Sequence, residues 1–271
     1  MKKILCLVLA LGMMTGALLA FSSCAEEAVT ETPADNTLVC GVTIFANMNE
    51  QDADGNWTGF ESEFAMEVGK LIGMDVKFQI IDWSQKYNEL NSGAIDCIWN
   101  GFTANSSDNG IKRSDLVDFS YGYMLNQQCI VVKNDDLAQY TDEASLAGKT
   151  AAAEGGSAGE AYAKGATTDV VAVTAQIDAF REVSSGAVDF IVVDILLAQN
   201  LCGTGNYENL SIVPTITLES EIYAIGFKKG SDLTAKVNEA ILTLEANGKL
   251  MELATKYGFE NVLKVNTGAI D

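Results

Sequence analysis

The sequence predicts an α/β protein with two lobes of similar construction. Between positions 38 and 101, short apolar strands alternate with amphipathic helices, which is typical of a mostly parallel sheet flanked by helices. A near-repeat is the second observation, because SGAIDCI at 92–98 returns as SGAVDFI at 185–191. Each copy closes a helix at glycine and opens a buried strand. Two lobes explain this repeat, with a single α/β core as the alternative.

The composition limits the classes of function that the chain can have. With 271 residues, of which 48% are hydrophobic, it can bury one large core or two moderate ones. Asp and Glu number 37 against 17 for Lys and Arg, and the formal net charge of −20 disfavours nucleic acid and anionic membrane surfaces as partners. The absence of histidine excludes histidine-dependent triads and histidine-ligated metals.

The N-terminus is typical of an export signal. Two lysines precede an apolar run at 4–20, and FSSC at 21–24 resembles a lipoprotein cleavage box. We expect residues 1–23 to be a signal peptide and Cys24 to carry a lipid that anchors the protein to the membrane. An ordinary export signal and an uncleaved membrane anchor are the alternatives. The acidic stretch that follows, to residue 36, predicts a flexible linker.

The first half of the chain carries three strands and two helices. Hydrophobic spacing and glycine stops define their limits. In order, they are a strand at 38–45, a helix at 59–72, a strand at 76–81, a helix at 82–90 and a buried strand at 97–99.

The stretch from 96 to 120 is the strongest candidate for a binding site. Its strand ends at Asn100 and Gly101, and a polar loop follows that contains Thr103 and Arg113. Glycine lets the backbone approach a ligand closely, and a guanidinium grips a carboxylate with two parallel hydrogen bonds. The alternative for Arg113 is a solvated surface charge.

The second half repeats this alternation of strands and helices. A glycine-rich turn at 154–159 has backbone N–H groups suited to a small anion. The expected elements are strands at 129–133, 150–153, 170–173 and 190–193, helices from about 160 and at 176–183, an extended segment at 218–227, helices at 231–246 and 250–257, and a loose tail from 264.

We expect neither a metal nor a cofactor. The stretch at 52–63 has oxygen side chains at calcium-loop positions, but Trp57 occupies the position that requires glycine. The cysteines have no CxxC spacing that would favour zinc, although Cys40 and Cys97 can pair if their strands are neighbours. The turn at 154–159 lacks the spacing of a nucleotide-binding loop.

Several motifs, in this order and with these gaps, resemble those of bacterial extracellular solute-binding proteins of family 3, which serve polar amino acid ABC importers. The resemblance covers about residues 38–260. The motifs are GFESEFAMEVGKLIG, DWSQKYNELNSGAIDCIWNGFT, KRSDLVDFS, GKTAAAEGGSAGE, AVDFIVVD, YAIGF and ANGKLMELATKYG.

The resemblance implies an α/β protein with a two-lobed, periplasmic-binding-protein-like fold of type II. Each lobe is a mostly parallel sheet flanked by helices, and two hinge strands join the lobes. Lobe 1 is expected from 37–126 plus 221–263, and lobe 2 with the hinges from 127–220. Residues 264–271 then form the tail.

The resemblance also implies the function. The expected protein is the extracytoplasmic substrate-binding component of an ABC importer, which captures a polar amino acid by lobe closure. Its partners are the amino acid, the transmembrane subunits of the importer and the membrane that anchors Cys24, at the cell surface or in the periplasm. We expect a monomer without enzymatic activity. A ligand-sensing module and a cyclohexadienyl-dehydratase-like enzyme, with Glu154 as its acid, are the alternatives.

For the charged groups of the ligand, the resemblance implies one cationic and one anionic contact. Arg113 would hold the α-carboxylate, helped by Thr103 and by the backbone and hydroxyl of Ser157. Asp194 would bind the α-ammonium together with a carbonyl group of Asn100 or Gly101. An insertion in the SSDNG region before Arg113, and Asn100 in place of a small residue, depart from the family pattern.

For the ligand side chain, the resemblance implies a sandwich between Phe45 and Trp83. Glu154 lies in the turn where relatives contact that side chain, which favours a cationic or amide ligand. Ala158 replaces the Thr or Gly of many relatives. Val42 occupies a position where relatives that bind basic ligands often have an acid, so the identity of the side chain stays open.

Overall fold

The computed structural model describes residues 36–270 of the chain. From Asn36 onward the chain forms one compact unit. The predicted signal peptide, Cys24 and almost all of the predicted linker lie outside the described residues. No helix within 36–270 has the length and apolar character needed to cross a membrane.

The first lobe is built on a five-stranded sheet. Its strand order is β4-β1-β5-β15-β8, with β1 parallel to both neighbours and β15 antiparallel to both of its own. The strands are β4 (Asp75–Ile80), β1 (Thr37–Val42), β5 (Cys97–Ile98), β15 (Gly226–Phe227) and β8 (Asp118–Phe119). Its helical elements are α1 (Phe60–Ile72), η1 (Trp83–Gln85), α2 (Lys86–Ser92), α3 (Arg113–Leu116), α7 (Leu233–Ala246) and α8 (Lys249–Tyr257).

The second lobe is built on another sheet, of strand order β11-β10-β12-β9-β13. Strand β10 is parallel to β11 and β12, whereas β9 is antiparallel to β12 and β13. The strands are β11 (Asp169–Val173), β10 (Thr150–Glu154), β12 (Phe190–Asp194), β9 (Gly122–Lys133) and β13 (Leu210–Ile212). The helical elements are η2 (Asn134–Gln139), η3 (Glu143–Leu146), α4 (Ala158–Ala166), α5 (Gln176–Ser185), α6 (Ile195–Leu201) and η4 (Gly205–Tyr207).

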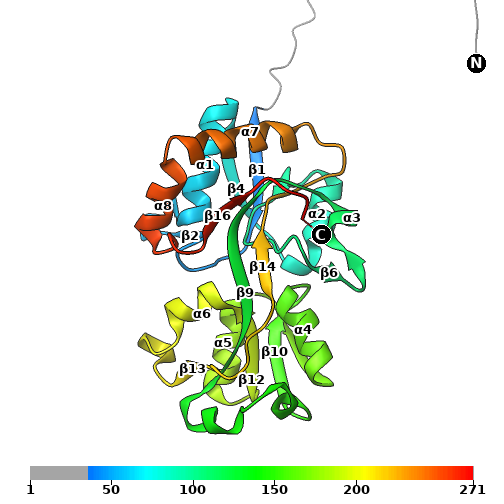
Figure 1. Ribbon diagram of the computed structural model, residues 1–271, viewed down its shortest axis with the longest axis vertical. Coiled ribbons are helices and arrows are strands. Elements are labelled where there is room, and N and C mark those ends of the chain that lie inside the picture. The colour runs from blue at the N-terminus through cyan, green and yellow to red at the C-terminus, as the bar shows by residue number, and fades with distance from the viewer. Residues whose placement is uncertain (1–35, 271) are drawn as a thin grey trace, which may run out of the picture. The chain divides into compact units, whose positions relative to one another are not determined.

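Strands β9 and β14 (Ser220–Tyr223) run side by side between the two lobes (Figure 1). The first half of β9 pairs with β14 and β16 (Leu263–Asn266), and its second half belongs to the second sheet. The predicted strand at 129–133 is therefore only the end of a twelve-residue strand. The predicted tail at 264–271 is also corrected, because β16 occupies its first residues. Two sheets joined by crossing strands confirm the prediction of two α/β lobes.

The sequence repeat produces the same local structure in both lobes. Gly93 and Gly186 end α2 and α5 in the left-handed conformation, with φ of 78° and 79°. The aspartate of each copy then accepts a hydrogen bond from the backbone of the neighbouring strand. Asp96 binds the Val39 N–H and Asp189 binds the Thr150 N–H, both at 2.8 Å. Each aspartate thus helps to align its strand with the neighbouring strand. As a result, the residues at the ends of β5 and β12 lie in the space between the lobes.

The insertion before Arg113 forms a small hairpin of β6 (Ser107–Asp108) and β7 (Ile111–Lys112). A second hairpin pairs β2 (Glu50–Gln51) with β3 (Trp57–Thr58). At the β6–β7 turn, Asn109 and Gly110 have φ of 52° and 80°. Asn-Gly is the preferred pair for a two-residue turn with positive φ at both positions. The insertion is therefore an ordered hairpin that carries Asp108 into the site.

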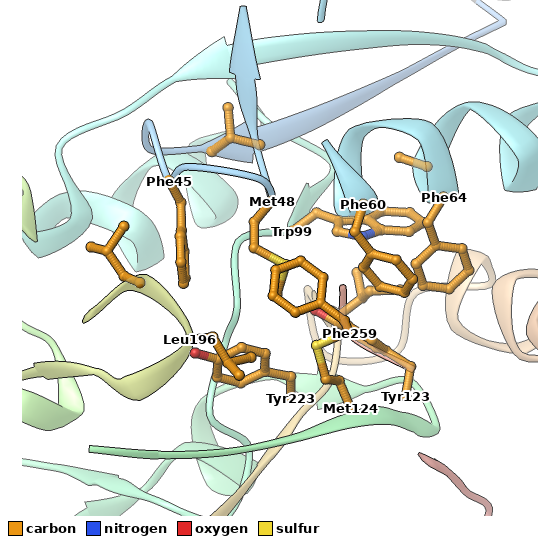
Figure 2. Packing of buried hydrophobic residues seen from close by; sticks show 14 of the residues in the cluster. Phe45, Met48, Phe60, Phe64, Trp99, Tyr123, Met124, Leu196, Tyr223 and Phe259 are labelled. Carbon is orange, nitrogen blue, oxygen red and sulfur yellow. The ribbon is translucent and has the colours of Figure 1, made fainter. Parts of the chain in front are cut away.

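Aromatic side chains dominate the core of the first lobe, as Figure 2 shows. Phe64 packs edge-on against Trp99 and Tyr123, with ring centroids 5.2 and 5.4 Å apart. Cys40 and Cys97 are register partners on neighbouring strands, and both are buried free thiols with their sulfur atoms 3.6 Å apart. The strands are thus neighbours, as a bridge between these cysteines would require.

Phe64→Ala should lower the free energy of unfolding by about 3–5 kcal/mol, because it leaves a cavity among close-packed aromatic rings. Leu71→Ala is the matched control on the same helix, since Leu71 is 48% exposed and should cost less than about 1 kcal/mol. Urea unfolding followed by circular dichroism measures both. Equal losses in the two variants would contradict this assignment of the core.

Candidate functional site

The candidate site lies where the carboxyl ends of β5, β10 and β12 meet the crossing strand β9. In α/β sheets, ligands bind outside the carboxyl ends of parallel strands. The cavity has a volume of about 10 Å³ and is lined by Trp83, Asn100, Gly101, Thr103, Arg113, Gln128, Glu154, Ser157, Ala158, Gln176 and Asp194. All the predicted ligand-binding residues except Phe45 lie here. So small a volume holds about one water molecule, so the lobes are closed tightly.

Phe45 supports the wall of the site from behind. Its side chain is 1% exposed and lies against Gly101, where a Cβ would come within 3.3 Å of the Phe45 ring and 3.0 Å of the Tyr223 ring. Gly101 also has φ of 55°, a conformation that favours glycine. Of the two aromatic residues predicted to sandwich the ligand side chain, Trp83 lines the cavity and Phe45 is not among its lining residues.

Arg113 is buried, with 1% of its surface exposed, so it is no solvated surface charge. Its Nε and Nη2 atoms donate to Asp108 Oδ1 at 3.0 and 2.9 Å. Its Nη1 atom donates to the Thr103 carbonyl at 3.1 Å, and Nη2 donates to the Gly156 carbonyl at 3.3 Å. Burial would raise the pKa of Asp108, but the cations of Arg113 and Lys86 hold it below its usual value. Asp108 therefore stays ionised and orients the guanidinium.

Lys86 is a second buried cation next to Arg113. Its Nζ donates to the Gly156 carbonyl at 2.9 Å and lies 3.3 Å from Asp108 Oδ2. Burial and the charge of Arg113 lower its pKa to about 8. Lys86 and Arg113 both belong to the first lobe, whereas Gly156 belongs to the second. These hydrogen bonds to one carbonyl therefore join the lobes directly.

Asp194 is the last residue of β12, and its carboxylate accepts hydrogen bonds from three side-chain amides. Asn126 and Gln128 donate to Oδ1 at 2.6 and 2.7 Å, and the Gln176 amide donates to Oδ2. The Asp194 N–H donates to Gln176 Oε1 at 2.9 Å. Burial raises the pKa of Asp194, while the donated hydrogen bonds oppose this rise. The result is a fixed, buried acid at the edge of the second lobe.

Glu221, on β14, shares these amides with Asp194. Its Oε2 accepts from Asn126 at 2.6 Å, from Gln128 at 3.0 Å and from the Thr103 hydroxyl at 3.1 Å. Burial, followed by the nearby charge of Asp194, raises the pKa of Glu221 to about 7. Because Thr103 donates its hydroxyl proton here, its oxygen is left to accept a hydrogen bond. This arrangement differs from the contact that the resemblance implies, in which the Thr103 hydroxyl would donate to the ligand carboxylate.

Glu154 and Ser157 flank the glycine turn that follows β10. Ser157 caps α4, since its hydroxyl accepts from the Glu160 N–H at 3.0 Å, while its own N–H donates to the Glu154 carbonyl at 3.1 Å. Glu154 is 2% exposed, and its Oε1 has no hydrogen-bond partner among residues 36–270. Burial and the charge of Asp194 raise the pKa of Glu154 well above its usual value.

A buried carboxylate also supports the backbone at Gly101. Glu61 is fully buried on α1, and its two oxygens accept from the Gly101 N–H at 2.9 and 3.0 Å. The Tyr123 hydroxyl and the Asn49 amide also donate to Glu61. Burial raises its pKa to about 7. The Asn100 side chain completes this support through its hydrogen bonds to Thr43, so it stabilises the wall of the site.

The amides of the site were not foreseen from the sequence. Gln128 and Gln176 line the cavity, and Asn126 lies beside them. Asn126 and Gln128 occupy alternate positions of one strand, which places them on the same face. That spacing is a usable signal once the strand is known to begin before residue 126. Asp108 lies within the stretch 96–120, but its contact with Arg113 was not predicted, and nothing in the sequence links Gln176 to this site.

The chain belongs to the bacterial extracellular solute-binding proteins, family 3, whose profile matches residues 38–261. Members of this family are binding proteins, and this membership agrees with the two-lobed type II fold. Over 252 residues the chain is 27% identical to the arginine-binding extracellular protein ArtP of Bacillus subtilis, covering 89% of this chain and 96% of ArtP. It is 29% identical to the L-cystine-binding protein TcyA of the same organism, covering 80% of this chain and 78% of TcyA.

Solved structures of similar proteins have the same fold. A substrate-binding protein of an ABC uptake transporter from Streptococcus pneumoniae, with bound histidine, has a TM-score of 0.75 at 29% identity, covering 84% of this chain and 95% of that one. An ancestral arginine-binding protein bound to arginine has a TM-score of 0.74 at 29% identity, covering 82% and 98%. These similarities confirm the predicted family and fold class.

The Glu61→Gln variant should remove one source of pH-dependent stability. The pKa of Glu61 rises from 4.5 to about 7, so between these pH values the folded protein keeps a proton that the unfolded chain releases. Stability therefore falls as pH rises through this window. We expect a shallower fall in Glu61→Gln, measured as the free energy of unfolding at several pH values. Identical slopes in wild type and variant would contradict the burial of an ionisable group here.

Proposed function

We propose that this protein captures a polar amino acid between its lobes and delivers it to an ABC importer. The observation that carries the proposal is that one fixed cation, Arg113, and one fixed anion, Asp194, line the same buried cavity. An α-amino acid carries the two complementary charges on one carbon. Closure of the lobes removes water from both contacts, which strengthens them.

In this proposal, opening of the lobes prepares Arg113 for the ligand. Its contact with the Gly156 carbonyl crosses from one lobe to the other, so it breaks when they separate. The Asp108 and Thr103 contacts lie within the first lobe and keep the guanidinium in place. The carboxylate of the ligand then occupies the freed donors, with Ser157 contributing its hydroxyl on closure. Asp194 binds the ammonium with the carbonyl of Asn100 or Gly101, and Trp83 and Ala158 contact the side chain.

The setting of this function is also proposed. Cys24 would carry the lipid anchor after removal of residues 1–23, which tethers a monomeric receptor outside the cytoplasmic membrane and close to the importer. The protein would act by binding and release, without catalysis. Its family and the presence of both Arg113 and Asp194 in one cavity support this role.

Thermal melting of residues 25–271 against each of the twenty amino acids tests the function directly. A ligand at about 100 times its dissociation constant stabilises the folded state by about 2.7 kcal/mol, which raises the melting temperature by several degrees. We expect this rise with one chemical group of amino acids. An unchanged melting temperature with all twenty would contradict the proposal.

Arg113→Ala and Asp194→Asn should each weaken amino acid binding by at least about 100-fold, because each leaves an unpaired charge of the ligand inside a closed site. Arg181→Ala and Asp135→Ala are the matched controls, since both side chains are exposed on the second lobe. Calorimetry gives the affinities, and circular dichroism checks that each variant folds. Wild-type affinity in both site variants would refute the site assignment.

A further inference from the structure

We infer that Glu154 selects ligands whose side chain carries a positive charge, and this inference rests on the proposed amino acid-binding function. Glu154 is 2% exposed, lines the cavity and leaves Oε1 without a hydrogen-bond partner among the described residues. A buried polar atom without a partner costs free energy comparable to a lost hydrogen bond. A hydrogen-bond donor on the ligand would therefore satisfy a buried acceptor that the protein itself leaves unpartnered within residues 36–270.

The neighbouring polar side chains of the protein do not donate a hydrogen bond to Glu154 Oε1. Both ends of the Gln176 amide are bound to Asp194. The Lys86 ammonium is directed to the Gly156 carbonyl and to Asp108. Glu154 therefore remains available to the ligand, although it lies close enough to Asp194 and Lys86 to sense their charges.

The balance of charges selects a cation over a neutral donor. Within residues 36–270, the ion pairs of Lys86 and Arg113 around the cavity go to Asp108, whereas Asp194, Glu221 and Glu154 form none, although Lys86 lies close enough to Glu154 to oppose the rise of its pKa. A bound zwitterion pairs with Arg113 and Asp194 and adds no net charge. Burial and the charge of Asp194 raise the pKa of Glu154 while no cation is bound, and a positive charge on the ligand side chain would oppose that rise and pair with the ionised carboxylate.

The geometry agrees with a ligand that reaches from one acid to the other. Glu154 ends β10 and Asp194 ends β12, and these parallel strands are direct neighbours. The two acids therefore lie at the same edge of the second lobe, one for the α-ammonium and one for a distal cation. Trp83 lines the cavity from the first lobe and offers an aromatic face to the chain between them.

One argument from the sequence stands against a basic ligand, because relatives that bind such ligands often have an acid at the position of Val42. The structure weakens this argument. Val42 is fully buried in the core of the first lobe and does not line the cavity. An acid is thus not missing from the site, because Glu154 provides one from the opposite lobe.

The test compares L-arginine and L-lysine with L-citrulline, which has nearly the shape of arginine without its charge. Calorimetry with wild-type protein should give at least tenfold tighter binding of arginine or lysine than of citrulline. Glu154→Gln should weaken binding of that cationic ligand by about 30-fold or more, because truncating one partner of a buried charge pair is costly. Its affinity for citrulline should stay within a few-fold of wild type. Glu208→Gln, an exposed acid of the same lobe, is the control for net charge and should change neither affinity.

Three outcomes would overturn the inference. Citrulline or glutamine bound as tightly as arginine and lysine by the wild type would show that charge is not selected. An unchanged affinity for the cation in Glu154→Gln would show that Glu154 does not select it. Tight binding of neutral or acidic amino acids alone would reject the cation while the proposed function stands, whereas no binding of any amino acid would reject the proposed function itself.

Discussion

The structure depends on two buried carboxylates that share two amides where the lobes meet. Asn126 and Gln128 lie on β9, which runs through both lobes, and each amide donates to Asp194 and to Glu221. The shared donors reduce the cost of holding two acids together out of water. Asp194 is thereby fixed at the end of β12 by a strand that also belongs to the first lobe. The anionic half of the site is consequently tied to the hinge itself.

The cationic half of the site is organised in the same way by a local counter-ion. Asp108, on the inserted β6–β7 hairpin, contacts both Arg113 and Lys86 and so holds two like charges close together in a buried place. Both cations then reach the Gly156 carbonyl of the opposite lobe. A carbonyl carries only a partial charge, so a carboxylate is the stronger partner for these donors. In the proposed function, closure on an amino acid would replace a weaker interlobe contact with a charged one.

Much of the fold follows from local patterns, and the departures have identifiable causes. Glycine stops and apolar spacing located most helices to within a few residues, as at Phe60–Ile72 and Gln176–Ser185. Strand β9 was predicted too short because its first half contains polar residues, among them Asn126, that face the hinge instead of a core. Phe45 lies against Gly101 and is not among the residues that line the cavity, and the sequence alone does not distinguish an apolar residue that lines a cavity from one that packs next to its wall.

The sequence by itself determined the alternation of strands and helices, the duplicated lobe and the positions of Arg113, Glu154 and Asp194. These follow from periodicity, from glycine turns and from motifs that are contiguous in the chain. Only the tertiary structure decided which groups those charges meet. Asp108 beside Lys86, Gln176 beside Asp194 and Glu61 beneath Gly101 are pairs brought together from separate elements. The physical reason is that burial makes each polar group depend on a partner nearby in space, and distance along the chain does not reveal that partner.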